Sequence, residues 1–361
     1  MPNVLIFVID MTFFVEFEVA SMTAERYVNA LWSERWARAG GRIGFLLLPK
    51  FSMLELFCAV EVLRIANRLG RAGYDWLFLS VDGRPVAASN GIAVDVTHRF
   101  DETATPQMLF VVASFEPEAA MDRKARSALQ RMARHGVLLG AVDTGAFILA
   151  RAGLLDGRRV TLHWEAIAAF AEEFPEVEVT SNLFELDRDR LTCSGGLATT
   201  DMMLYLIALQ HGEDLANLVT EQIVHPKMRS GADAQRMPPK LRYRLNDPDV
   251  STAVAIMEAH LDLPLSVADI ALRIGLSQRQ LERLCREQLG RTAKNVYVGL
   301  RLERARQLLT DSRLSVTEAA VSTGFQSVSH FSRSFRQAFG HAPRTARTQI
   351  VPPVGLRGRN A

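Results

Sequence analysis

A duplicated motif constrains the last third of the chain. One pattern occurs twice: an amphipathic helix, a turn that contains glycine, and a second helix with basic residues on one face. The first copy, Leu265–Gly290, is LSVADIALRIGLSQRQLERLCREQLG, and the second, Leu314–Gly340, is LSVTEAAVSTGFQSVSHFSRSFRQAFG. Because both copies begin and end alike, the sequence predicts a folding unit that is itself duplicated.

Each copy carries the signals of a helix-turn-helix. Ser266 and Ser315 suit N-cap positions, since each is followed three residues later by an acidic side chain. Gly275 and Gly324 allow the positive φ that ends a first helix. The second helix then has an apolar stripe and, on its opposite side, arginines such as Arg283. A plain helical bundle with solvated arginines would also fit one copy, but two copies with matching caps and turns favour the helix-turn-helix.

The span between the copies predicts their spacing. The second helices begin at corresponding serines, Ser277 and Ser327, and one continuous helical pattern runs from Ala293 to Thr310 between them. A stiff helix there would hold the two basic helices about one DNA turn apart, ~34 Å, so that they enter successive major grooves. In a major groove arginine binds guanine through two hydrogen bonds, and serine or histidine contacts a base edge or a phosphate.

In these residues the chain closely resembles the AraC/XylS family of bacterial transcription regulators. The resemblance covers the duplicated region and is carried by Leu302–Leu309, Gly324–Phe325, His330–Arg336 and Gly340–Pro343. It implies a bipartite DNA-binding domain. Glu282 stands where the family often has a neutral or basic residue, so its part in base readout is open; it could equally accept from cytosine. The residues expected at the DNA are Gln278, Arg279, Gln280, Arg283, Arg286, Ser329, His330, Ser332, Arg333 and Arg336.

Charge distinguishes two parts of the chain. The 361 residues have a formal net charge of +2, from 42 basic and 40 acidic side chains. Residues 249–347 contribute 14 of the basic and 9 of the acidic side chains, so the remainder is net negative. A phosphate-binding domain requires such a local positive balance. The chain is also long enough for two domains that each bury a core.

The sequence lacks the signals of export, membrane insertion and metal binding. Its three cysteines lie far apart without paired spacing, which favours a reducing compartment over disulfides or a zinc site. No apolar run reaches the length of about eighteen residues that a membrane span needs. The apolar stretch Met1–Ala20 is interrupted by acidic residues and has no basic start, unlike a signal peptide. These features predict a cytoplasmic protein without cofactor or metal, and the resemblance to the AraC/XylS family implies a bacterial, nucleoid-associated one.

Strands alternate with helices from Arg42 onward. Buried strands are predicted at 43–48, 76–80, 108–112 and 137–142, and helices at 54–69, 118–135 and 146–155. Near-continuous apolar strands separated by helices predict a mostly parallel sheet that is covered on both faces. In such sheets ligands bind at the strand-to-helix turns of the carboxyl edge, and Asp143-Thr144-Gly145 is a turn of this kind.

This part of the chain resembles the class I glutamine amidotransferase-like, or PfpI-like, fold in the version fused to AraC-type domains and often called the GlxA group. The resemblance covers roughly residues 42–215 and is carried by Gly140–Ala150, Ala152–Gly157, Thr161–Trp164, Cys193–Gly196 and Asp201–Leu204. It implies a flavodoxin-like α/β sandwich. In enzymes of that fold a nucleophilic cysteine occupies the strand-to-helix turn, whereas this sequence has Asp143 there.

Asp143 favours a sensor over an enzyme. A carboxylate at a helix N-terminus is stabilised in its charged form and does not replace a thiol nucleophile. Thr144 is an alternative nucleophile but has no evident base. Asp143 could also serve as the N-cap of the next helix, which does not exclude ligand binding, and a fixed negative charge near aromatic rings favours a cation.

The resemblance implies a small nitrogenous effector, such as betaine, carnitine, a choline derivative or arginine. The candidate effector residues are Asp143, Thr144, Phe147, His163, Trp164, Glu55 and Glu61. For His163 a packing role is an equal alternative, and for both glutamates a solvated helix face is the alternative. Cys193 is expected to be a core thiol.

Together these features predict a ligand-responsive transcription regulator, expected to be an activator. It would bind double-stranded DNA as a homodimer, with RNA polymerase as a further candidate partner. The expected parts are a leader (1–40), a sensor and dimerisation domain (41–216), a linker (217–248), a C-terminal bundle with two helix-turn-helix units (249–347) and a disordered tail (348–361). The alternatives are an amidase-like or hydrolase-like enzyme tethered to DNA, and a constitutive regulator whose first domain only dimerises.

Overall fold

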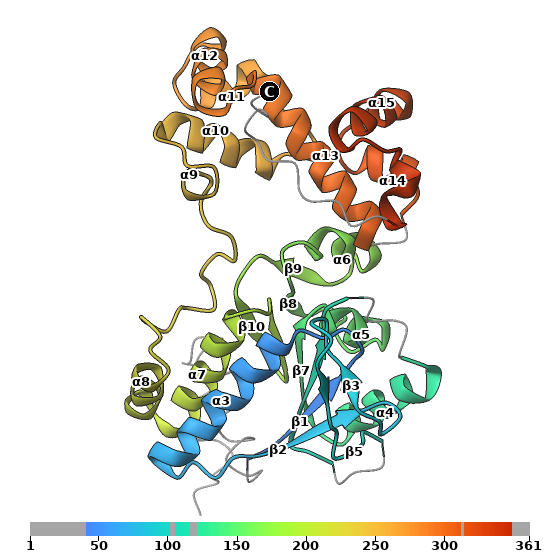
Figure 1. The fold of residues 1–361 in the computed structure, drawn as a ribbon, viewed down its shortest axis with the longest axis vertical. Coiled ribbons are helices and arrows are strands. Elements are labelled where there is room, and N and C mark those ends of the chain that lie inside the picture. The colour runs from blue at the N-terminus through green and yellow to red at the C-terminus, as the bar shows by residue number, and fades with distance from the viewer. Residues whose placement is uncertain (1–40, 102–104, 116–120, 312–313, 349–361) are drawn as a thin grey trace, which may run out of the picture. The chain divides into compact units, whose positions relative to one another are not determined.

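The computed structural model of the chain describes residues 41–101, 105–115, 121–311 and 314–348. The expectations for residues 1–40 and for the tail after 348 lie outside this part of the chain. The described residues form two compact units (Figure 1). The first contains the described residues up to His163 together with Glu176–Asp233, and the second contains Trp164–Pro175 and the described residues from Ala234 onward. The linker expected at 217–248 is thus divided between the two units.

The first unit is the α/β domain that the sequence predicted. Its elements are β1 (Arg42–Leu47), α3 (Met53–Gly70), β2 (Asp75–Ser80), β3 (Val86–Ala87), β4 (Ala93–Val94), β5 (His98–Arg99), β6 (Met108–Ala113), α4 (Arg123–Arg134), β7 (Leu138–Asp143), α5 (Gly145–Arg151), β8 (Arg159–Thr161), β9 (Glu178–Thr180), β10 (Phe184–Asp187), β11 (Arg190–Cys193), α7 (Ala198–His211) and α8 (Glu213–Gln222). The predicted strands and helices match within a few residues, except that α4 begins later than the expected residue 118.

Seven strands form one sheet in the order β10-β11-β7-β6-β1-β2-β5. Every neighbouring pair is parallel except β10 with β11, so the prediction of a mostly parallel sheet is confirmed. Helices α3, α7 and α8 pack together on one face, and α4 and α5 lie on the other (Figure 1). Strands β6 and β7 are buried along their whole length, which explains their continuous apolar sequences.

Close packing at the centre of the sheet requires a small residue. The rings of Phe45 on β1 and Phe110 on β6 stack with their centroids 5.8 Å apart. Gly140 on β7 lies beside Phe110, and an added Cβ would overlap that ring. A side chain at this position would push β7 away from β6, and with it the turn that follows β7.

The second unit is helical. Its elements are α6 (Ile167–Glu173), α9 (Pro239–Arg242), α10 (Pro248–Ala259), α11 (Val267–Arg273), α12 (Gln278–Leu289), α13 (Ala293–Asp311), α14 (Val316–Val321), α15 (Val328–Phe339) and the 3-10 helix η2 (Pro343–Thr348). Helices α11 and α12 form the first helix-turn-helix, α14 and α15 form the second, and α13 runs between them (Figure 1). None of the described helices combines the length and apolar character of a membrane span.

The predicted caps and turns of the two copies are confirmed. The Ser266 hydroxyl accepts from the N–H of Asp269 at 3.1 Å. Ser315 and Glu318 form a complete capping box at the start of α14. Gly275 and Gly324 have φ of +75° and +72°, the left-handed conformation that a residue with a side chain rarely adopts. The local sequence therefore specifies where each first helix begins and ends.

Candidate DNA interface and effector site

The candidate DNA interface consists of one face of α12 and one face of α15. Each helix buries its apolar stripe: Leu281, Cys285 and Leu289 in α12, and Phe331 and Phe335 in α15. The opposite faces hold the residues expected at the DNA. Ser332 is half-buried. The others are exposed: Gln278, Arg279, Gln280, Arg283, Arg286, Ser329, His330, Arg333 and Arg336.

Equivalent arginines recur in the two helices. Counted from the N-cap serines Ser277 and Ser327, Arg283 of α12 corresponds to Arg333 of α15. Arg283 forms an exposed ion pair with Glu287, at 2.6 Å between Nη1 and Oε1. Such an exposed pair contributes little to stability, so the guanidinium can exchange Glu287 for a DNA acceptor at low cost.

Two polar side chains of α12 already have partners within the domain. The Gln280 amide oxygen accepts from the Ser277 backbone N–H at 2.8 Å, which completes a capping box. Glu282 Oε2 accepts from the N–H of Ala293 at 3.0 Å and thereby satisfies a donor at the start of α13. The structure therefore gives Glu282 a helix-capping role, and acceptance from cytosine would compete with it.

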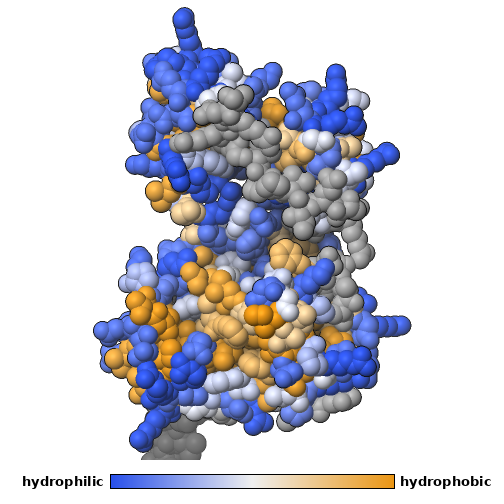
Figure 2. Space-filling model, viewed as in Figure 1, coloured by the Kyte–Doolittle hydropathy of each residue, from blue (hydrophilic) through white to orange (hydrophobic). Residues whose placement is uncertain are grey.

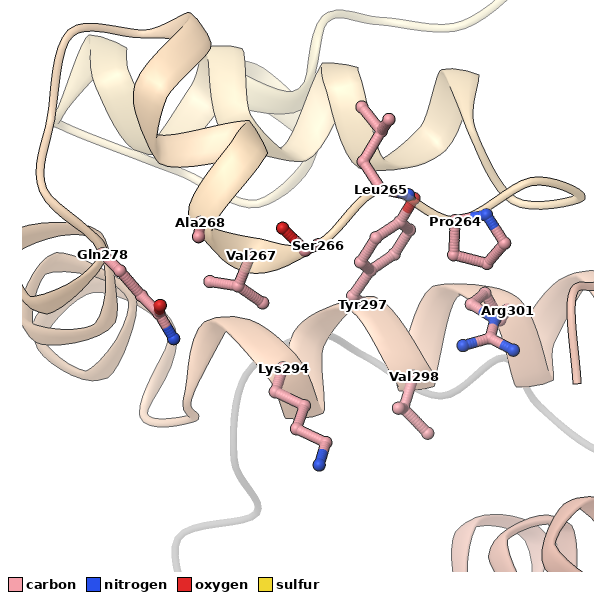
Figure 3. Close-up of a pocket in the computed structure, with 10 residues that line it drawn as sticks. All are labelled: Pro264, Leu265, Ser266, Val267, Ala268, Gln278, Lys294, Tyr297, Val298 and Arg301. Atoms are coloured by element: carbon pink, nitrogen blue, oxygen red, sulfur yellow. The ribbon is translucent and has the colours of Figure 1, made fainter.

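A pocket of about 310 Å³ lies in the second unit between the start of α11 and α13 (Figure 3). Tyr297 holds these elements together, because its hydroxyl donates to the His260 carbonyl at 2.5 Å and accepts from the Leu265 N–H at 3.2 Å. The charged residues of the lining are Lys294 and Arg301. A positively charged lining repels cations, so this pocket does not suit the nitrogenous effector expected from the sequence.

The candidate effector site begins at the turn after β7. Asp143 is the last residue of β7 and has φ +57°, in the left-handed region. Gly145, the first residue of α5, packs so closely on β6 that an added Cβ would overlap the Val111 carbonyl oxygen. The turn is therefore sharp because α5 must start directly against the sheet. Thr144, not Asp143, occupies the N-cap position of α5.

Glu55, in the first turn of α3, meets Asp143 at this turn. Glu55 is 3% exposed and Asp143 6% exposed. Both lie against Gly195, where an added Cβ would overlap Glu55 Oε1 and lie 3.0 Å from Asp143 Cβ. Glu55 Oε1 accepts from the Gly196 N–H at 3.0 Å. Burial, followed by the negative charge of Asp143, raises the pKa of Glu55 well above its usual value. We call these two residues the acid pair.

The thiol and hydroxyl groups near this turn are not arranged as activated nucleophiles. Cys193 is fully buried, and burial raises the pKa of its thiol to about 12, so it is protonated and hidden, as expected of a core thiol. Burial also raises the pKa of Cys58, which is half-buried. The Thr144 hydroxyl donates to the Ser114 carbonyl at 2.8 Å, and a carbonyl oxygen cannot act as its general base.

The other expected effector residues differ in their surroundings. Glu61 lies on the exposed face of α3 and forms an ion pair with Arg64 at 2.7 Å, so the solvated alternative fits it. Phe147 is buried on α5, with the guanidinium carbon of Arg151 5.3 Å from its ring centroid. His163 is half-buried and belongs to the first unit. Trp164 belongs to the second, where the Arg236 guanidinium lies 4.2 Å from its ring.

Gly195 and Gly196 have a role in the site that was not predicted from the sequence. Both have positive φ, +85° and +55°, and together they bring a backbone N–H to the Glu55 carboxyl group. Two consecutive glycines directly after a buried strand, at the edge where ligands collect, were an available signal for a close approach of backbone to a polar group.

Comparison with known proteins places both units in named families. Residues 41–208 match the DJ-1/PfpI family, and residues 270–349 match a helix-turn-helix domain. The chain is 46% identical over 306 residues to the HTH-type transcriptional regulator CdhR of Pseudomonas aeruginosa, covering 85% of this chain and 91% of that protein. It is 38% identical over 308 residues to the HTH-type transcriptional regulator GlxA of Rhizobium meliloti, covering 85% and 95%. A solved AraC family transcriptional regulator from Pseudomonas putida is 31% identical, with a TM-score of 0.47, and covers 51% of this chain and 99% of that one.

Proposed function

Because the chain belongs to the AraC-type transcriptional regulators that carry an N-terminal DJ-1/PfpI domain, we propose that it activates transcription in response to a small metabolite that contains a positively charged nitrogen group. The metabolite binds at Asp143 and Glu55, in a first unit that catalyses no reaction. The observation that carries this proposal is the buried acid pair at a turn that has no thiol. A regulator of this kind works where the chromosome is, in the bacterial cytoplasm, and contacts RNA polymerase as an activator.

The two basic helix faces support binding to two successive major grooves. Helix α13 has 19 residues, so at 1.5 Å per residue it is about 28 Å long and can separate α12 from α15 by most of one DNA turn. Arg283 and Arg333 lie at equivalent exposed positions and are the proposed base contacts, with the remaining exposed polar residues at bases or phosphates.

Three observations support a sensor rather than an enzyme. Asp143 occupies the position where enzymes of this fold place their nucleophilic cysteine, Cys193 is buried and protonated, and the Thr144 hydroxyl is bound to a carbonyl. A buried negative charge instead attracts a cation. Betaine, carnitine, choline and arginine each combine a positively charged nitrogen group with a small body and are the effector candidates.

A homodimer would bring two copies of the DNA-binding unit to one operator. Exposed apolar side chains on the first unit support self-association: Leu54 and Phe57 on α3 and Leu218 on α8 are 52%, 54% and 51% exposed. Figure 2 shows hydrophobic side chains gathered over the part of this unit that contains α3, α7 and α8. An exposed apolar patch of this kind is typical of a protein–protein interface.

A thermal-shift assay tests the sensor. Each candidate effector is added to the full-length chain and to Asp143→Asn. A ligand at a hundred times its dissociation constant stabilises the native state by about 2.7 kcal/mol. We expect at least one of the four compounds to raise the melting temperature of the wild-type protein and not that of the variant. If none does, and a reporter gene responds equally with and without the compounds, the constitutive regulator replaces this proposal. A covalent adduct on Thr144 or Cys193 would instead support the tethered enzyme.

A further inference from the structure

The acid pair contains a buried oxygen atom to which no described residue donates a hydrogen bond. Glu55 Oε1 accepts from Gly196, whereas Glu55 Oε2 is enclosed and accepts from no donor in the described part of the chain; the polar group within hydrogen-bonding reach of Glu55 is the Asp143 carboxyl group. A buried polar atom without a donor destabilises the folded state, and it does so more strongly if it is charged. Its surroundings therefore determine whether Glu55 carries a proton and what the site can bind.

The groups that face Glu55 are all neutral or acidic. They are Asp143 on β7, Cys193 on β11 and Cys58 on α3 itself, and the two thiols also lie near Asp201 on α7. Asp201 already has compensation, because Arg229 Nη2 donates to it at 2.6 Å and His225 Nε2 lies 3.0 Å away. Within the described ranges, no cationic side chain is among the groups that shift the pKa of Glu55. Two adjacent carboxyl groups that are shielded from water do not both ionise.

We propose that Glu55 and Asp143 hold one proton between them at neutral pH, so that the acid pair presents a single negative charge and binds a monovalent organic cation without releasing that proton. Glu55 carries the proton, and Asp143 carries the charge. This inference rests on the proposed effector function and specifies the charge of its ligand. One negative and one positive charge leave the buried complex neutral, whereas a doubly ionised pair would retain an uncompensated charge in the complex.

Gly196 is the side from which a ligand can approach. An added Cβ at Gly196 would meet no atom within 4 Å, so open space adjoins the N–H that binds Glu55. At Gly195 the same addition would overlap the acid pair. Gly195 therefore packs closely on the two carboxyl groups, whereas Gly196 leaves open space beside them.

Calorimetric titration of the full-length protein tests the proposal, with choline as the probe and 3,3-dimethylbutan-1-ol, its uncharged carbon analogue, as the comparison. Choline and the analogue have the same shape and differ by one positive charge. We therefore expect choline to bind at least about tenfold more tightly than the analogue. The measured heat should be the same in buffers of different ionisation enthalpy, because no proton is transferred to the buffer. If the binding heat instead varies with the ionisation enthalpy of the buffer as expected for the release of one proton, the proposal is wrong.

Matched variants separate the two carboxyl groups. Asp143→Asn removes the charge and should weaken choline binding at least about tenfold. Glu55→Gln imitates a protonated glutamate, so its effect on choline binding at neutral pH should be much smaller. At alkaline pH Glu55 of the wild type loses its proton and the affinity for choline should rise, whereas Glu55→Gln should show no such rise. Glu61→Gln, the same substitution on the exposed face of α3, is the control. Equal losses in Glu55→Gln and Asp143→Asn would mean that both groups are ionised, and the inference would fail while cation sensing could stand.

Infrared spectroscopy tests the shared proton without any ligand. A protonated carboxyl group has a C=O stretching band that is separate from the carboxylate bands. At neutral pH we expect such a band in the wild type and in Glu61→Gln, and its loss in Glu55→Gln. If the wild type lacks the band, the inference is wrong, whichever of the four effector candidates binds. If choline does not bind but another candidate does, the proposed function survives and the simple monovalent site does not.

Discussion

At the scale of single residues, the left-handed backbone conformation of Asp143 determines where its carboxyl group lies. With φ +57° at the end of a buried strand, Asp143 points its carboxyl group at Glu55 instead of capping α5, whose N-cap is Thr144. The alternative that Asp143 serves as the N-cap of α5 is therefore wrong: the N-cap is Thr144, and Gly145, the first residue of α5, is packed against β6.

Glu55 should make stability depend on pH in an unusual direction for a carboxyl group. Its folded-state pKa is raised above the ordinary 4.5, first by burial and then by Asp143, so the folded protein holds the proton more tightly than the unfolded chain does. The resulting stabilisation is fully present below pH 4.5 and is lost as pH rises through the folded-state pKa. Relative to Glu55→Gln, the wild type should lose free energy of unfolding across that window.

Urea unfolding of both proteins at a series of pH values measures this difference. The signal should come from the first unit, because the two units need not unfold together. Glu61→Gln is again the control, since Glu61 is exposed and its hydrogen bond and ion pair with Arg64 hold its pKa below the usual value. A difference between wild type and Glu55→Gln that stays constant with pH would show that Glu55 is ionised in the folded protein.

At the scale of elements, α12 and α15 should contribute separately to operator recognition. Arg283→Ala and Arg333→Ala should each weaken operator binding by about 1–3 kcal/mol and relax the choice of base at one position of the site. Binding to variant operators, measured at one salt concentration, tests both effects. Arg273→Ala, which removes an exposed arginine from α11, is the control. Unchanged affinity in both test variants would remove the proposed base contacts.

Glu282 should matter for folding rather than for base choice. Because its carboxylate accepts from the N–H of Ala293, Glu282→Ala should destabilise the second unit by about 1–2 kcal/mol through the start of α13. Glu287→Ala, on the exposed side of the same helix, should cost less. Thermal unfolding compares the two variants. If Glu282→Ala unfolds like the wild type but selects a different operator base, its role is in DNA recognition after all.

The helix-turn-helix units could be predicted because their signals are local. Caps such as Ser315 with Glu318, and glycines such as Gly324, act within four residues of one another. The acid pair could be predicted only in part, since Glu55 and Asp143 meet through the order of the strands, which brings the end of β7 near the start of α3. Glu61 has the same residue type and the same helix as Glu55, and only the packed structure distinguishes the buried glutamate from the exposed one.

At the scale of the whole molecule, self-association should depend on the exposed face of α3. Phe57→Glu places a charge in the apolar patch and should weaken the dimer at least about tenfold, because burying an unpaired charge is costly. Light scattering coupled to gel filtration measures the mass over a range of concentrations. Ile92→Glu, at an exposed apolar residue before β4, should leave the mass unchanged. A wild-type mass of one chain at every concentration would exclude the dimer.

The path of the chain has a practical consequence for anyone who recombines such regulators. Trp164–Pro175 leaves the first unit between β8 and β9, joins the second, and returns. A fusion made at residue 234 would therefore give the recipient a DNA-binding half without α6 and without Trp164, on whose ring Arg236 stacks. A chimera that keeps its operator-binding half intact has to graft two pieces of the gene, although a single crossover looks sufficient in the linear sequence.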